Sequence, residues 1–225
     1  MNNIDTSFTF GNAVTFESLT IVPLLGTSSP QARYDTLDAA LGRGTLHITE
    51  VSDSGSVPEI KVLNHGPQPV LIIDGEELVG AKQNRTVNLS ILVPPAANTI
   101  VPVTCVEAGR WSARSRSFSS APRTHFAAGR AAKSSQVSAS LLRDGVAHAN
   151  QSQVWKEIAH RSARLKVHSE TAAMSDIFER QSSAIESFVR ELPIADRTRD
   201  PRAPEQKRKS VFPRARPETG KAVDL

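Results

Sequence analysis

The amino-acid sequence predicts an α+β fold in which a β-rich N-terminal half, mainly an antiparallel sheet or a sandwich, packs with a helical C-terminal half. Two observations predict it. Short branched apolar runs separated by turn residues occur up to residue 107, whereas apolar residues at spacings of three and four dominate from about residue 137. Because the strands precede the helices and no repeat of solenoid or propeller length is present, α+β is favoured over a doubly wound α/β sheet.

The β-rich half is expected to contain one short helix among its strands. Strands are predicted at residues 19–25, 45–51, 57–63, 69–73, 86–93 and 99–107. Residues 86–93 alternate apolar and polar side chains, which is the period of a strand with one buried side. The helix is predicted at residues 34–41, because Tyr34, Leu37 and Leu41 fall at helical spacing before two glycines.

Helical periodicity marks the second half, after a Ser/Arg/Ala-rich connection at residues 112–133. The periodicity is strongest over residues 174–192, clear over residues 154–165 and weaker over residues 137–142. We therefore expect the sheet to be followed by helices at these three places.

The length of 225 residues and the hydrophobic fraction of 39% suit a single domain. We expect a polar lead-in at residues 1–18, one α+β domain at residues 19–192 and a basic, Pro/Arg-rich tail at residues 193–225. The tail holds nine Lys/Arg and five Asp/Glu, which leaves 18 of each sign in the rest of the chain and places the whole net charge of +4 in the tail. Its few apolar residues cannot offset the entropy of ordering, so the tail is predicted to be disordered.

Composition and motifs narrow the classes of function. The single cysteine excludes an intrachain disulfide framework, the N-terminus lacks the pattern of a secretory signal, and no apolar run approaches the roughly 20 residues that span a bilayer. We therefore expect a cytoplasmic protein with no membrane partner. The charge-balanced body argues against specific nucleic-acid binding. The six histidines lack zinc-ligand spacing, so no metal site is predicted, and the identity of any cofactor is left open.

One stretch, residues 74–85, places charged side chains between two apolar runs. It contains the adjacent carboxylates Glu76 and Glu77, which must point to opposite faces of a strand. The carboxylate that faces the core needs a partner, and we expect it to pair with Arg85, Lys82 or a ligand. Paired buried carboxylates can act as general acid and base, so both are candidate catalytic residues, and a structural Arg–Glu pair is the alternative.

A second polar cluster lies where the strand at residues 99–107 runs into a loop. Glu107, Arg110 and Trp111 together suit recognition of a planar or anionic small molecule by pairing and stacking, although an arginine stacked on a tryptophan can also be a structural clamp. Cys105 precedes them. It is either a small buried hydrophobe or a nucleophile activated by a distant histidine, and the first is favoured because no histidine lies in the motif.

Residues 75–85 and 105–111, with residues 46–51 and 57–59 upstream, carry a family resemblance. Over about residues 19–192 the chain resembles the prokaryotic "ARG and Rhodanese-Phosphatase-superfamily-associated Protein" domain family. The resemblance implies a domain without an established reaction and a set of shared polar residues. These residues are Glu76, Glu77, Gln83, Asn84, Arg85, Glu107, Arg110 and Trp111.

Chains that resemble this family continue, after a segment like residues 190–196, into an apolar stretch and a last helix. Here the composition turns to Arg, Pro and Lys at about Arg197. We expect a change of reading frame or a truncation to be the cause. The absence of an apolar continuation in both other frames of the encoding DNA would contradict this.

Two functions are compatible with the shared polar residues. In the first function they line one pocket that binds a small polar or anionic molecule. Glu76, Glu77 and Glu107 are then the candidate catalytic groups, and the other five are ligand-binding groups. Whether the domain is an enzyme is left open. In the second they are structural ion pairs in a protein-interaction module that serves as an adaptor. The first function requires the two clusters to lie close together.

Overall fold

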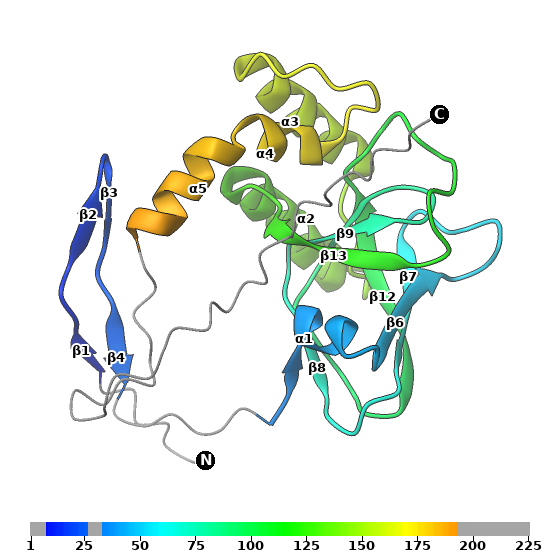
Figure 1. The fold of residues 1–225 in the computed structure, drawn as a ribbon. Coiled ribbons are helices and arrows are strands. Elements are labelled where there is room, and N and C mark those ends of the chain that lie inside the picture. Colours follow the sequence, from blue (N-terminus) through cyan, green and yellow to red (C-terminus); the bar gives the residue numbers. More distant parts are fainter. Residues whose placement is uncertain (1–7, 27–32, 193–225) are drawn as a thin grey trace, which may run out of the picture. The chain divides into compact units, whose positions relative to one another are not determined.

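Figure 1 shows the fold in a computed structural model, which describes residues 8–26 and 33–192. By its internal contacts the chain divides into two compact units, one of residues 28–191 and the other of both ends of the chain. The predicted tail at residues 193–225 lies outside the described residues.

Two antiparallel strand pairs make up the described strands of the unit that holds the chain ends. β1 (Phe8–Phe10) pairs with β4 (Leu24–Gly26), and β2 (Val14–Phe16) pairs with β3 (Leu19–Ile21). The strand predicted at residues 19–25 is therefore two strands, interrupted at Pro23. Proline has no N–H to donate to a ladder, although the Pro23 carbonyl still accepts from Gly11 N at 2.8 Å.

Six antiparallel strands form the main sheet of the second unit (Figure 1). In spatial order they are β13 (Phe118–Thr124), β9 (Glu76–Gly80), β10 (Arg85–Val87), β12 (Ala97–Cys105), β7 (Glu59–Asn64) and β6 (Leu46–Glu50). The sheet curls until its edge strands, β13 and β6, contact each other. A buried apolar core takes side chains from all six strands, among them Leu78, Val87 and Val103, and therefore lies inside the curl.

A smaller sheet joins β5 (Asp35–Thr36), β8 (Val70–Ile72) and β11 (Ile91–Val93), with β5 parallel to β8. Helix α1 (Leu37–Gly42) follows directly, and the Thr36 hydroxyl caps it by accepting from Ala39 N at 3.4 Å. This helix lies within about three residues of its predicted position.

The strand predicted at residues 86–93 is wrong as one element. Its first residues belong to β10 in the main sheet and its last to β11 in the smaller one. The chain changes sheets near Asn88, whose side chain donates to Ala147 O at 2.9 Å and accepts from Thr104 Oγ1 at 2.6 Å. The apolar alternation persists across the break because each segment buries one side against the same core.

Four helices complete the described part of this unit. They are α2 (Ala127–Asp144), α3 (Gln151–Arg164), α4 (Met174–Arg180) and α5 (Ser182–Glu191). Figure 1 shows α2, α3 and α4 gathered at one end of the curled sheet, and α1 with β8 at the other. A second apolar cluster, which includes Val106, Val154 and Met174, joins α3 and α4 to the end of β12. The predicted α+β class, with strands before helices, is confirmed.

Two boundaries differ from the sequence predictions in this half. The helix predicted at residues 174–192 is interrupted at Gln181, which separates α4 from α5. The connection predicted at residues 112–133 contains strand β13 and the start of α2. β13 is an edge strand whose side chains are mostly exposed or half-buried, so it carries no apolar alternation that could reveal it.

Candidate functional site

The register of the main sheet decides which side chains of the two polar clusters can meet. Glu77 lies directly opposite Thr86, whereas Arg85 lies directly opposite both Leu78 and Cys105. Directly paired residues share a face of the sheet, so Glu77 projects from the face opposite to that of Arg85. Of the three partners predicted for the buried glutamate (Arg85, Lys82 or a ligand), Arg85 is therefore excluded for Glu77.

Glu77 is the buried member of the adjacent carboxylates and has no exposed surface. Its Oε2 accepts from Nε of Arg123 on β13 at 2.5 Å, so its partner is neither Arg85 nor Lys82. Its Oε1 makes no hydrogen bond within the described ranges. Burial raises the pKa of Glu77, and the Arg123 guanidinium opposes that shift without cancelling it.

Glu76 projects to the other side of β9 and is half-buried. Its Oε2 accepts from Ile73 N at 2.8 Å, which ties it to the turn that leads into the strand. Burial raises the pKa of Glu76 above its ordinary value. The two adjacent carboxylates therefore sit in separate environments and do not act as a pair.

Arg85 is fully buried and belongs to a cluster closed by the protein itself. Its guanidinium lies 3.3 Å from Oε2 of Glu50 and donates to the carbonyls of Ser56 and Val57. The Trp111 ring covers it, with the guanidinium carbon 5.6 Å from the ring centroid. The stacked arginine of the structural clamp is thus Arg85, not the neighbouring Arg110.

Glu107 and Arg110 form a second buried ion pair, with Nη2 of Arg110 donating to Oε2 of Glu107 at 2.6 Å. The same carboxylate oxygen accepts from Asn84 N at 3.1 Å, and the Glu107 carbonyl accepts from Nε2 of Gln83 at 2.7 Å. Burial alone would raise the pKa of Glu107, but the hydrogen bonds from Arg110 and from Asn84 N outweigh it and lower the pKa. Glu107 is therefore ionised at neutral pH.

Arg110 also fixes the loop between β9 and β10. It donates to the carbonyls of Ala81 at 2.7 Å and Gly80 at 3.3 Å, and to Oδ1 of Asn84 at 3.1 Å. Both loop residues have positive φ, +118° at Gly80 and +39° at Ala81. Oδ1 of Asn84 accepts from Arg110 and from Gly80 N, and its amide nitrogen makes no hydrogen bond to the described residues, so this nitrogen can donate to a ligand.

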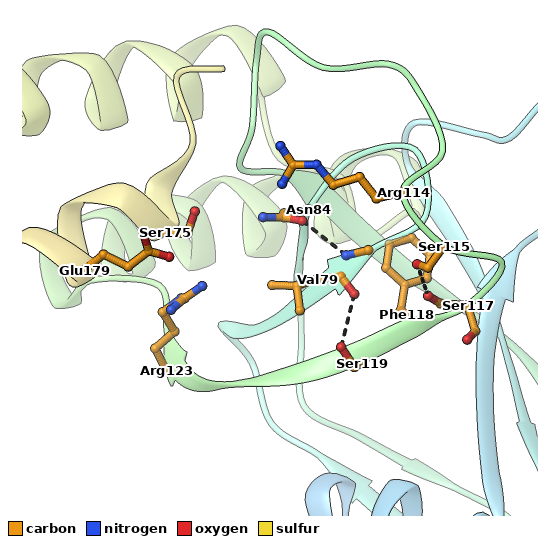
Figure 2. Close-up of a pocket in the computed structure, with 11 residues that line it drawn as sticks. Val79, Asn84, Arg114, Ser115, Ser117, Phe118, Ser119, Arg123, Ser175 and Glu179 are labelled. Carbon is orange, nitrogen blue, oxygen red and sulfur yellow. Dashed lines mark hydrogen bonds between the residues drawn. The ribbon is translucent and has the colours of Figure 1, made fainter. Parts of the chain in front are cut away.

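A cleft of about 460 Å³ opens beside this loop. We call it the Arg114–Arg123 cleft. Its lining comes from β9, β13, the loops beside them and α4, and consists of Val79, Gly80, Asn84, Arg114, Ser115, Ser117, Phe118, Ser119, Arg123, Ser175 and Glu179. Figure 2 shows the Asn84 amide between the side chains of Arg114 and Arg123, with Ser175 and Glu179 on another side.

The two arginines of the cleft differ in how firmly they are held. Arg123 is 19% exposed and pairs with Glu77, so its guanidinium is oriented from behind. Arg114 is 61% exposed and lies 3.8 Å from Oε1 of Glu107, the one carboxylate that pairs with it among the described residues. The cleft therefore presents one fixed and one adjustable cation, each backed by a buried carboxylate.

The structure brings some of the eight predicted site residues to this cleft and leaves others away from it. Asn84 lines the cleft, and Glu77, Glu107 and Arg110 lie directly behind its lining. Gln83 donates to the carbonyl of Glu107 and so lies with the residues behind the lining. Three residues contact other parts of the fold: Glu76, Arg85 and Trp111. The sequence prediction missed Arg114, Arg123 and Glu179, because no local pattern distinguishes a cleft arginine from a solvated one.

Cys105 is fully buried, and burial raises its pKa to about 11. It is therefore a neutral thiol at physiological pH and behaves as a small apolar side chain. Over residues 8–26 and 33–192 no group of three or more His, Cys, Asp or Glu side chains could hold a metal ion. No helix in the described part of the chain is long and apolar enough to cross a bilayer.

Comparison with known proteins identifies one family. The model of the ARG and Rhodanese-Phosphatase-superfamily-associated Protein domain matches residues 7–199. No curated protein and no solved structure matches the chain.

Proposed function

Because the chain belongs to the ARG and Rhodanese-Phosphatase-superfamily-associated Protein domain family, whose description states no reaction, we propose a function from geometry: the domain binds a small polar or anionic molecule in the Arg114–Arg123 cleft. The observation that carries this proposal is the convergence of Arg114, Arg123 and the free Asn84 amide nitrogen on one opening. Guanidinium groups pair with carboxylate or phosphate oxygens through two parallel hydrogen bonds, and an amide nitrogen adds a directed donor.

Burial of the supporting groups strengthens the proposal. Glu77 and Glu107 have no exposed surface and lie behind the cleft, each next to one of its cations. A ligand that meets groups held in this way loses little free energy to ordering them. Exposed serines at positions 115, 117 and 119 supply hydroxyl groups around the rim for a polar ligand.

If the domain is an enzyme, Glu77 is the carboxylate we assign to acid–base chemistry. Its raised pKa and its Oε1 without a hydrogen-bond partner within the described ranges are properties of a group that can exchange a proton. Because Glu77 has no exposed surface, proton exchange with a ligand requires Arg123 to leave this pairing, a step that binding alone does not need. Glu107 fits the role of a permanent charge that holds Arg110, and Glu76 does not line the cleft.

The alternative function is a non-enzymatic adaptor, in which these residues are structural ion pairs. It is favoured by the closed Arg85–Glu50–Trp111 cluster and by the Glu107–Arg110 pair, both of which satisfy their charges within the protein. Cytoplasmic location remains part of both proposals.

A thermal-shift screen tests ligand binding, with nucleotides, sugars, sugar phosphates, dicarboxylates and divalent ions as the probes. Wild type is compared with Arg114→Gln and with Arg116→Gln, because Arg116 is exposed in the same loop and does not line the cleft. We expect at least one compound to raise the melting temperature of wild type and of Arg116→Gln but not of Arg114→Gln. The binding proposal fails if no compound stabilises wild type, or if each hit is equally strong in both variants.

Glu77→Gln separates binding from catalysis once a ligand is found. Glutamine keeps the size of the side chain and can still accept from Arg123, so ligand binding should persist. Turnover of that ligand, followed by chromatography of the reaction mixture, should be lost if Glu77 transfers a proton. Turnover equal to that of wild type would exclude the catalytic role and leave the binding role standing.

A further inference from the structure

A second cleft lies between α2 and α3, away from the residues that line the Arg114–Arg123 cleft. It has a volume of about 250 Å³, and we call it the α2–α3 groove. Its lining residues are Phe126, Ala128, Gly129, Ala132, Glu157, His160, Arg161 and Arg164. The α2 wall is made of Ala and Gly, so α3 supplies the long polar side chains.

The polar residues of α3 in the groove form one stripe. Glu157, His160, Arg161 and Arg164 are spaced by three and four residues, so they face the same side of the helix. Two guanidinium groups and an imidazole thus meet a single carboxylate. The surplus is positive, and an imidazole offers an N–H donor in either protonation state.

The arginines of this stripe have no carboxylate partner among the residues that the structure describes. Neither arginine forms an ion pair with a carboxylate within residues 8–26 and 33–192, although Glu157 is one turn from Arg161. Glu157 instead accepts from Nε2 of Gln153 at 3.1 Å. The basic groups are therefore available to an anion from outside the chain.

The guanidinium of Arg161 is held in place while some of its hydrogen-bond donors have no partner in the described structure. Its guanidinium carbon lies 4.8 Å from the centroid of the Phe126 ring, and its buried Nε has no hydrogen-bond partner in the described structure. Stacking on an aromatic face fixes the plane of a guanidinium while leaving its in-plane N–H donors free. This arrangement suits an oxyanion that enters between the helices.

We propose that the α2–α3 groove binds a phosphate group, with Arg161 as the oriented anchor and Arg164 and His160 as the outer donors. Phosphate is preferred over a carboxylate because its second negative charge matches two guanidinium groups, even with Glu157 nearby. The small side chains of α2 leave room for the oxygens. This site is independent of the function proposed for the Arg114–Arg123 cleft.

Titration of the full chain with inorganic phosphate, at constant ionic strength maintained with chloride, tests the site by two-dimensional amide NMR. We expect saturable shifts centred on residues 126–132 and 157–164. Acetate over the same concentrations should bind at least threefold more weakly. Shifts that do not saturate, that centre on Arg123 instead, or that acetate reproduces at equal concentration would overturn the proposal.

Charge-removing variants on one helix give the matched comparison. Arg161→Gln should weaken phosphate binding about tenfold or more, whereas Lys156→Gln, an exposed position on α3 outside the groove lining, should change it less than twofold. Arg164→Gln, also exposed, tests the same site without disturbing the contact with Phe126. Equal weakening by Lys156→Gln and Arg164→Gln would show a diffuse charge effect and contradict the site.

Discussion

Glu107 and Arg110, three residues apart, form a buried ion pair at 2.6 Å, and the same guanidinium donates to the carbonyls of the loop that carries Asn84. This relationship connects the strand end of β12 with the β9–β10 loop. It places the free amide nitrogen of Asn84 at the Arg114–Arg123 cleft. The pair therefore acts on the cleft by positioning and does not line it.

Removing the guanidinium of this pair should destabilise the domain strongly. Arg110→Met leaves the buried Glu107 with the exposed Arg114, 3.8 Å away, as its remaining cationic partner, so we expect a loss of about 3–5 kcal/mol in the free energy of unfolding. Urea unfolding followed by circular dichroism measures it. Arg143→Met, at an exposed arginine paired with Asp144, is the control and should have little effect. Similar losses in the two variants would contradict the structural role of Arg110.

The pH dependence of stability should reveal the lowered pKa of Glu107. Its folded-state pKa lies below the ordinary value of 4.5, so its contribution is fully present above pH 4.5 and is lost as the pH falls through the folded-state pKa. Glu107→Gln should therefore be less stable than wild type at pH 7, and the difference should shrink below pH 4.5. Urea unfolding from pH 3 to 7 measures this difference. A constant difference would show that the carboxylate charge is not the cause.

The contribution of Glu77 to stability should depend on pH in the opposite direction to that of Glu107. Its folded-state pKa is raised, so its contribution to stability is complete below the ordinary value of 4.5 and is lost as the pH rises through the folded-state pKa. Relative to Glu77→Gln, wild type should lose stability as the pH rises from 4 to 8. Glu186→Gln, at an exposed glutamate on α5, is the control for loss of one negative charge. A difference that grows in favour of wild type over this range would refute the raised pKa.

The backbone at Gly80 should tolerate no side chain. Its φ is +118°, and a Cβ there would lie 2.5 Å from Oγ of Ser115 and 2.8 Å from the Ser117 carbonyl oxygen. Gly80→Ala should cost on the order of 1–3 kcal/mol from strain alone, measured by thermal or urea unfolding. Gly42→Ala, at the end of α1 with no atom within 4 Å of the added Cβ, should be neutral or slightly stabilising. The prediction is wrong if Gly80→Ala changes the free energy of unfolding as little as Gly42→Ala does.

Local sequence patterns predict the position of a helix or strand well where the segment has its own period or a long motif. The apolar alternation of residues 99–107 marks β12 to within about two residues, and the helical stripe of residues 154–165 marks α3. The predictions are wrong for segments that lack such a period or motif. β13 falls within a predicted connection because an edge strand with mostly exposed or half-buried side chains has the composition of a loop. Residues 86–93 kept one alternation through a change of sheet, since both segments face the same core.

The same distinction applies to the candidate site. The amino-acid pattern alone is enough to predict the α+β class, the family and the burial of one of the two adjacent glutamates, because alternation along a strand is a local property. The folded structure is needed to show that this glutamate is Glu77 and that Arg123 is its partner, 46 residues further along the chain. Register places Arg85 on the opposite face of the sheet, and antiparallel pairing sets β13 beside β9, so the Glu77–Arg123 pair follows from contacts that no local pattern encodes.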